Sequence, residues 1–407
     1  MSGAGGESGH GAGQPAPTDH PVGMRALART FFWIGLTSYG GPAIVAQIRK
    51  VTVQKKLWLT DDEFSESLAF CQTLPGPIAV QTGAHVAWRL RGALGALVAT
   101  VAYVLPAFLL MLGLSALYFR TGQLPAVQTV LQGLRAVVVA IVADSILSMA
   151  QPSLKDWRGV LLAGVAAAAL LGGVSAILVL LGAALLAVPL LWNVLPPAAP
   201  ESRVMKPRGN RWRGPLVIGL VALLFAGATF LSGALNPVLP DLTLTLMKVD
   251  MLAFGGGYTA VALMHDQVVK MHPWLNPSEF LDGLALGQIT PGPVILTATF
   301  IGYKVAGLAG AVAATVGVFL PSWLLLALLA PQFERIRGIV AVYRMVRGLL
   351  AAFVAMLIYV LWQVGGAALQ DGKSLLLAIA ALAALRFKIP PLWVVGGGMA
   401  ISAILFR

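Results

Sequence analysis

The chain repeats itself: an apolar segment broken by Pro-Gly-Pro occurs at residues 75–77 and again, 216 residues later, at residues 291–293. The same offset aligns the Gly-Gly pairs at 40–41 and 256–257. A one-residue deletion then keeps both copies in register as far as Gly133 and Gly348. A match sustained over so many positions indicates a duplicated structural unit, which in membrane proteins is typical of transporters.

The composition places both copies in a membrane. Apolar residues make up 58% of the chain and charged residues 11%, whereas soluble proteins carry about 25% charged residues. Mean hydropathy is +0.84. Apolar stretches of at least about 18 residues recur, each long enough to cross a bilayer as a helix. The sequence therefore predicts an all-α, polytopic membrane protein.

Glycine and proline interrupt the first two apolar segments of each copy. Such breaks are tolerated inside a membrane only where the backbone is buried in protein or lines a cavity, so we expect broken helices there. The expected segments lie at 25–48, 61–90, 92–119, 126–149, 158–173 and 175–194 in the first copy, and at 242–264, 279–305, 306–330, 339–363, 374–387 and 391–406 in the second.

The chain divides into five parts by composition and repeat. Residues 1–23 lack an apolar core and are predicted to be a disordered tail. Residues 24–195 form the first membrane repeat, and 236–407 form the second. Between them lie a basic linker at 196–214, expected in the cytoplasm, and a helix at 215–235 that has no counterpart in the first copy.

Charge and span number predict that the two repeats are inverted. The loop with Arg49, Lys50, Lys55 and Lys56 is basic in the first copy and nearly neutral in the second, and cytoplasmic loops are enriched in Lys and Arg. If the broken segments are re-entrant, four full spans plus the extra helix give an odd number. We therefore expect a cytoplasmic N-terminus and a periplasmic C-terminus.

The breaks are candidate anion sites. Proline is favoured at the first position of a helix, so a half-helix with free N–H groups and a positive dipole end should begin at each Pro-Gly-Pro. Inversion would point both starts at one centre, where an anion binds; kinks that only assist packing are the alternative. Arg135 would offset the charge of a dianion. The predicted substrate-binding residues are Gly40, Gly41, Gln72, Pro75, Gly76, Pro77, Arg135, Gly256, Gly257, Gln288, Pro291, Gly292 and Pro293.

Three acidic residues in or near the apolar segments have other interpretations. Asp144 is a candidate carrier of a coupling proton, or else the ion-pair partner of a basic residue on another helix. Glu63 and Glu279 occupy matched positions and are interpreted as helix-capping residues, near Thr60 and Ser278.

The segments FWIGLTSYGGPAIVAQI and LAFCQTLPGPIAVQ, with FGGGYTAV and LALGQITPGPVILTATFIGY in the second copy, resemble the chromate ion transporter family. The resemblance runs from residue 24 to the C-terminus and matches the two-repeat type. It implies a bacterial inner-membrane protein that exports chromate, confers chromate resistance and uses the membrane potential or a proton gradient. One departure is Tyr258, where the first copy has Pro42.

Other functions are weighed against this one. A transporter of sulfate or another oxyanion and a passive anion channel would share the same backbone site, so both stay open. A membrane enzyme is disfavoured, because the sequence has one cysteine, Cys71, and neither a dinucleotide fingerprint nor a paired metal-ligand motif. No cofactor, metal or nucleic acid is expected. The expected partners are an oxyanion, the lipid bilayer and, optionally, a second copy in a homodimer.

Overall fold

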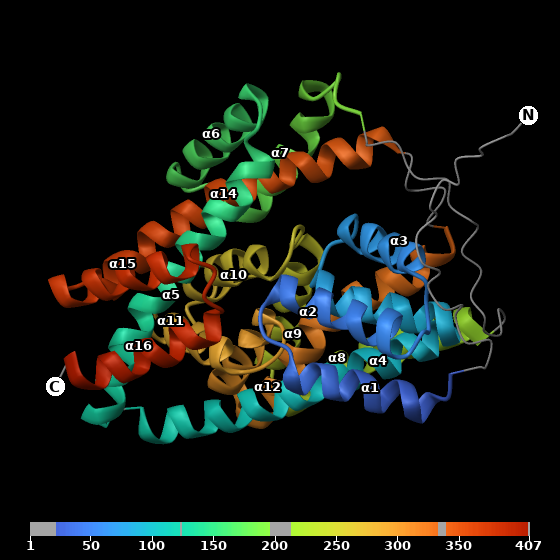
Figure 1. Cartoon of the computed structure of the whole chain (residues 1–407), viewed down its shortest axis with the longest axis horizontal. Helices are drawn as coiled ribbons and strands as arrows, with labels where there is room; N and C mark the ends of the chain where they lie inside the picture. Colours follow the sequence, from blue (N-terminus) through green and yellow to red (C-terminus); the bar gives the residue numbers. More distant parts are fainter. Residues whose placement is uncertain (1–21, 123, 196–212, 333–338, 406–407) are drawn as a thin grey trace, which may run out of the picture.

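The computed structural model describes residues 22–122, 124–195, 213–332 and 339–405, and the described residues are helical with short connections (Figure 1). The predicted tail and basic linker lie outside them apart from a few residues at their ends. The first repeat contains α1 (Met24–Thr37), α2 (Gly41–Arg49), α3 (Asp61–Gln72), α4 (Ile78–Thr121), α5 (Pro125–Ser153), α6 (Trp157–Leu171) and α7 (Ala176–Leu190).

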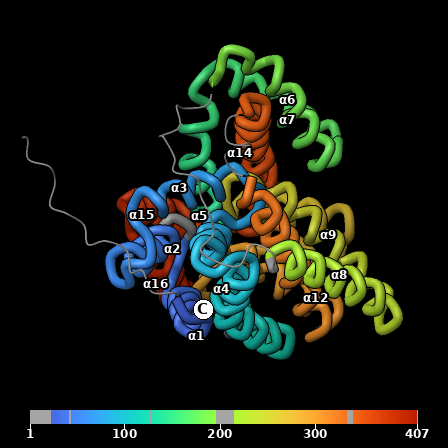
Figure 2. Tube along the Cα trace, turned by 90° about the vertical axis from the view of Figure 1, so that its right-hand side faces the viewer, coloured from blue at the N-terminus to red at the C-terminus, as the bar shows by residue number. Residues whose placement is uncertain are grey.

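The second repeat has the same order of elements. It contains α9 (Val238–Leu252), α10 (Gly257–His265), α11 (Pro277–Ile289), α12 (Thr297–Leu329), α14 (Val340–Ala368), α15 (Gly372–Arg386) and α16 (Pro391–Leu405). Short π-helical turns extend α2 and α10. Between the repeats, α8 (Arg213–Leu235) lies at the periphery beside α9 and α12 (Figure 2).

The prediction of an all-α membrane protein is confirmed. Within the described ranges, five helices are long and apolar enough to cross a bilayer, at Ile78–Thr121, Val127–Ser153, Gly214–Leu235, Val294–Gln332 and Val340–Ala368. By contrast α6, α7, α15 and α16 have 15 residues each, or about 22 Å at 1.5 Å per residue. Such helices are shorter than the roughly 30 Å hydrocarbon core.

A re-entrant hairpin forms where the first Pro-Gly-Pro interrupts the chain. Helix α3 begins at a capping box made by Thr60 and Glu63. Helix α4 leaves the break and reverses at Arg91 and Gly92, where the backbone is not helical and Gly92 has φ 66°. Just before the reversal, Arg89 lies 3.1 Å from Glu63. The first arm of α4 therefore returns to the end at which α3 began.

The second repeat builds the same hairpin from different residues. Lys304, just before the matched reversal at Ala306 and Gly307, lies 2.7 Å from Glu279. Glu279 belongs to a capping box, as predicted, but the cap is Asn276 rather than Ser278. The reason is local: Pro277 takes the first helical position, which suits its fixed φ, so the residue before it becomes the cap.

The repeats exchange their last two helices. Helices α6 and α7 pack on α14 of the other repeat, while α15 and α16 pack on α5 (Figure 1). Close approach occurs at the matched glycines: an added Cβ at Gly133 would lie 2.3 Å from Ser402 Cβ, and one at Gly348 would lie 2.4 Å from Ala187 Cβ. The start of α5 therefore lies beside α16, which follows α14, and the start of α14 lies beside α7, which follows α5. Helices α5 and α14 thus run antiparallel, and the repeats are inverted.

Candidate functional site

The breaks of the two repeats meet. The Gly76 amide donates to the Ala253 carbonyl of the second repeat at 2.8 Å, and the Gly292 amide donates to the Ser38 carbonyl of the first repeat, also at 2.8 Å. Each Pro-Gly-Pro break is therefore hydrogen-bonded to the glycine-rich break of the other repeat. The two Pro-Gly-Pro breaks and the two glycine breaks are thereby gathered in one region of the fold.

The glycines of the breaks fall into two kinds. Gly76 (φ 109°) and Gly292 (φ 114°) are packed: an added Cβ would lie 2.5 Å from Ser322 Cβ and 2.8 Å from Ala107 Cβ, respectively. Gly40 (φ 74°) and Gly256 (φ 120°) also have positive φ, but an added Cβ would meet nothing within 4 Å. The absence of a side chain at Gly76 and Gly292 allows the breaks to pack closely, whereas Gly40 and Gly256 border free space.

Polar side chains from three helices converge beside the second glycine break. Tyr258, in the first turn of α10, interacts with Gln288 of α11 and with Ser145 of α5. Among the described residues, the Gln288 Nε2 atom is buried and has no hydrogen-bond partner. Ser145 donates its hydroxyl to the Ile141 carbonyl at 2.8 Å. The candidate side-chain donors here are therefore Tyr258 and Gln288, beside the N-terminus of α10, whose first N–H groups have no partner within the helix.

The matched position in the first repeat is built differently. There Pro42 stands at the place of Tyr258 and Val360 at the place of Ser145. Gln72 is exposed at the end of α3, whereas Gln288 is buried. The two glutamines that the alignment pairs thus have different surroundings, and the structure brings only Gln288 into a cluster of described polar side chains.

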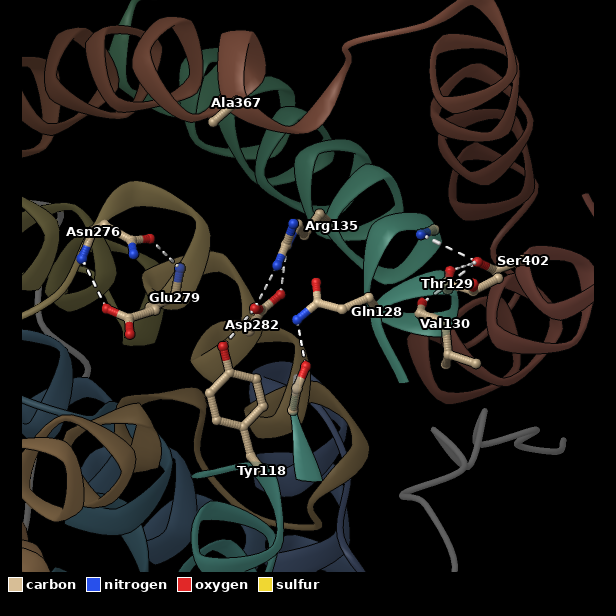
Figure 3. A network of polar contacts seen from close by, with 12 residues as sticks. Tyr118, Gln128, Thr129, Val130, Arg135, Asn276, Glu279, Asp282, Ala367 and Ser402 are labelled. Atoms are coloured by element: carbon tan, nitrogen blue, oxygen red, sulfur yellow. Dashed lines mark hydrogen bonds and ion pairs between the residues drawn. The ribbon is translucent and has the colours of Figure 1, made fainter. Parts of the chain in front are cut away.

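Arg135 is held in a buried ion pair that links the repeats (Figure 3). Its guanidinium donates to both carboxylate oxygens of Asp282, at 2.6 and 2.7 Å, and Tyr118 donates to the same carboxylate at 2.8 Å. Asp282 is fully buried. While the pair is intact, the charge of Arg135 is compensated by protein. An acidic residue inside the predicted segment 279–305 was the signal for this partner.

Asp144 lies near a basic side chain of the second repeat and near Tyr258. Its carboxylate is 3.6 Å from Arg386 of α15, and it lies within electrostatic reach of Tyr258. Its side chain is 29% exposed. The ion-pair interpretation of Asp144 thus has a named partner, and the coupling role stays a prediction. In the described ranges, no group of three His, Cys, Asp or Glu side chains is arranged to hold a metal ion.

Comparison with known proteins identifies the family. The profile of the chromate transporter family matches twice, at residues 25–188 and 240–403. The chromate transport protein of Cupriavidus metallidurans is 31% identical over 373 residues, or 90% of this chain and 88% of that protein. That of Pseudomonas aeruginosa is 32% identical over 323 residues, or 76% and 72%.

An uncharacterised transporter of Methanocaldococcus jannaschii is 31% identical over 338 residues, covering 81% of this chain and 82% of the relative. No solved structure matches. The profile recovers the same duplication that the sequence and the fold display. On these grounds the chain belongs to the chromate transporter family.

Proposed function

We propose that this protein is a secondary transporter that exports chromate across the bacterial inner membrane and so confers chromate resistance. Family membership supports the substrate class. The chain has no Walker P-loop, GxxxxGK[ST], so nucleotide hydrolysis is not its own energy source. An inside-negative potential of 100 mV favours the exit of a dianion by about 4.6 kcal/mol, twice the value for one charge. The membrane potential thus favours export.

The anion binds, in this proposal, beside the second glycine break. The observation that carries it is the convergence of Tyr258 and Gln288, with the Gln288 Nε2 atom buried and without a partner among the described residues. Hydroxyl and amide donors stabilise an oxyanion, and the N-terminus of α10 adds free N–H groups and a positive dipole end. A tetrahedral dianion has enough lone pairs to accept from all of them.

Access alternates as one repeat moves against the other. The Arg135–Asp282 pair connects α5 of one repeat to α11 of the other, so this movement has to break or remake it. When the pair opens, the Arg135 guanidinium becomes available to offset the dianion, as the sequence predicts. The pair then acts as a gate whose opening supplies positive charge to the site.

The test is chromate flux into proteoliposomes that contain the purified protein, under an imposed membrane potential and with sulfate as competitor. Accumulation against the chromate gradient, driven by an inside-positive potential and resistant to sulfate, is expected. Flux that only dissipates a gradient would favour the channel, and strong competition by sulfate would make sulfate or a related oxyanion the substrate. Protein-free liposomes serve as the control.

A further inference from the structure

A second acidic residue lies deep in the fold, at the far end of the same glycine break. Asp250, near the end of α9, is fully buried. Its Oδ2 atom accepts from the Ser322 amide at 2.7 Å. In the part of the chain that the structure describes, its Oδ1 atom is buried and has no hydrogen-bond partner. One oxygen of this carboxyl is therefore fixed and the other is unused.

Asp250 is connected to both kinds of break. Its backbone carbonyl accepts from the Ala253 amide at 3.3 Å, and the Ala253 carbonyl accepts from the Gly76 amide at 2.8 Å. Ser322, which holds its side chain, also packs directly against Gly76. The four residues that follow Ala253 lead to Tyr258 in the proposed anion site. A change at Asp250 is thus transmitted to the first Pro-Gly-Pro break and to the start of α10.

The carboxyl has no counterpart in the first repeat. The alignment places Ile34 opposite Asp250 and Ala107 opposite Ser322, and Ile34 is buried. A buried aliphatic side chain is therefore compatible with the fold at this position. An isolated buried carboxylate costs several kcal/mol unless it is neutralised, so its presence in one repeat needs a reason other than packing.

The surroundings favour a proton over a metal ion as the neutralising species. The polar group facing Asp250 is Ser322 of α12, and no charged side chain among the described residues of α8, α10 or α12 interacts with it. Hard metal cations need about six oxygen ligands, whereas the carboxyl offers one unused oxygen. A proton needs only that oxygen.

We propose that Asp250 binds and releases the proton that is coupled to anion movement. This inference rests on the proposed function. The proton attaches to Oδ1 and leaves from it, and no other bond changes. An anion at the start of α10 and an ionised Asp250 repel each other across a short break, so anion binding favours the protonated carboxyl.

The test measures proton uptake when chromate is added to the purified, full-length protein in weakly buffered detergent, with a blank titration that corrects for chromate's own protonation. At the alkaline pH at which Asp250 is ionised in the absence of an anion, the wild type is expected to take up protons on binding, and Asp250→Asn is expected to bind chromate without proton uptake. Asp241→Asn, on the exposed start of the same helix, should behave as wild type. Proton uptake that persists in Asp250→Asn, or that is lost in Asp144→Asn instead, overturns the proposal, as does a requirement for sodium.

An infrared measurement separates this proposal from the proposed function. Without any anion, the wild type should show the carbonyl band of a buried protonated acid that Asp250→Asn lacks and that disappears at alkaline pH. Absence of such a difference overturns the proposal even if chromate binds. If the wild type binds no chromate, the proposed function fails and the infrared band still decides whether Asp250 exchanges a proton. Should Asp250→Asn not fold, Asp250→Glu should shift the band, and an unchanged band counts against Asp250.

Discussion

The two breaks of this protein have matching backbones and different side chains. Gly76 and Gly292 both have positive φ, and each donates to a carbonyl of the other repeat at 2.8 Å. Yet the second repeat has Asp250 before its glycine break and Gln288 before its Pro-Gly-Pro break, whereas the matched positions of the first repeat hold a buried isoleucine and an exposed glutamine. Duplication has therefore kept the backbone geometry in both copies while the side chains beside the breaks differ.

The largest expected effect tests the shared backbone. Gly76→Val and Gly292→Val each add a Cβ within 2.8 Å of a packed side chain at a positive φ. Strain and overpacking together amount to as much as about 6 kcal/mol, so both variants should lose monodisperse folded protein. Cys71, the single cysteine, is buried, so its labelling by a thiol-reactive dye during heating reports unfolding.

Gly40→Ala and Gly256→Ala serve as the matched pair, because an added Cβ there meets no atom within 4 Å. These variants carry only the backbone strain of a positive φ. If Gly76→Val unfolds at the wild-type temperature, the breaks are not held as tightly as their contacts indicate.

The ion pairs of α3 and α11 give the next effect. Asp282→Asn leaves Arg135, whose side chain is 17% exposed, without its counter-charge, which should lower the free energy of unfolding by at most about 3–5 kcal/mol. At the matched position, Glu66→Gln leaves Arg89 paired with Glu63, so a loss of less than about 1 kcal/mol is expected. Thermal unfolding followed through Cys71 compares the two variants. Equal losses of stability would contradict the expectation that Asp282 contributes more than Glu66.

The two glutamines test the asymmetry through transport rather than stability. Hydrogen bonds to charged groups contribute about 1.5–3 kcal/mol, so Gln288→Met should raise the chromate concentration for half-maximal flux by about 10- to 100-fold. Gln72→Met changes an exposed side chain and should shift it much less. The measurement is flux at graded chromate concentrations. Similar shifts for both variants would indicate that both glutamines bind the anion, as the sequence predicts.

The smallest effect concerns the two hairpin ion pairs. Lys304→Met removes a pair whose lysine side chain is 35% exposed, which should cost less than about 1 kcal/mol. Arg89→Met removes contacts to two glutamates from a side chain that is 12% exposed, so a larger loss is expected. A greater loss for Lys304→Met in the same dye assay would show that exposure does not rank these pairs.

The sequence predicts local elements well because they depend on nearby residues. The segment expected at 126–149 is α5 at Pro125–Ser153, and the breaks fall where glycine and proline place them. The partner of Arg135 lies 147 residues away, beyond the reach of periodicity or capping rules. The alignment also gives Gln72 and Gln288 the same context, so their different burial depends on helices packed by the other repeat.

The exchange of end helices sets an order of events during synthesis. When the first repeat has entered the membrane, α6 and α7 have no α14 to pack on, and α5 has neither α15 nor α16. At about 5–20 residues per second, the last of the missing helices follows about 11 to 43 seconds after α7. The nascent first half therefore waits in lipid as an incomplete structure, and it becomes a finished domain only when the last helix of the chain arrives.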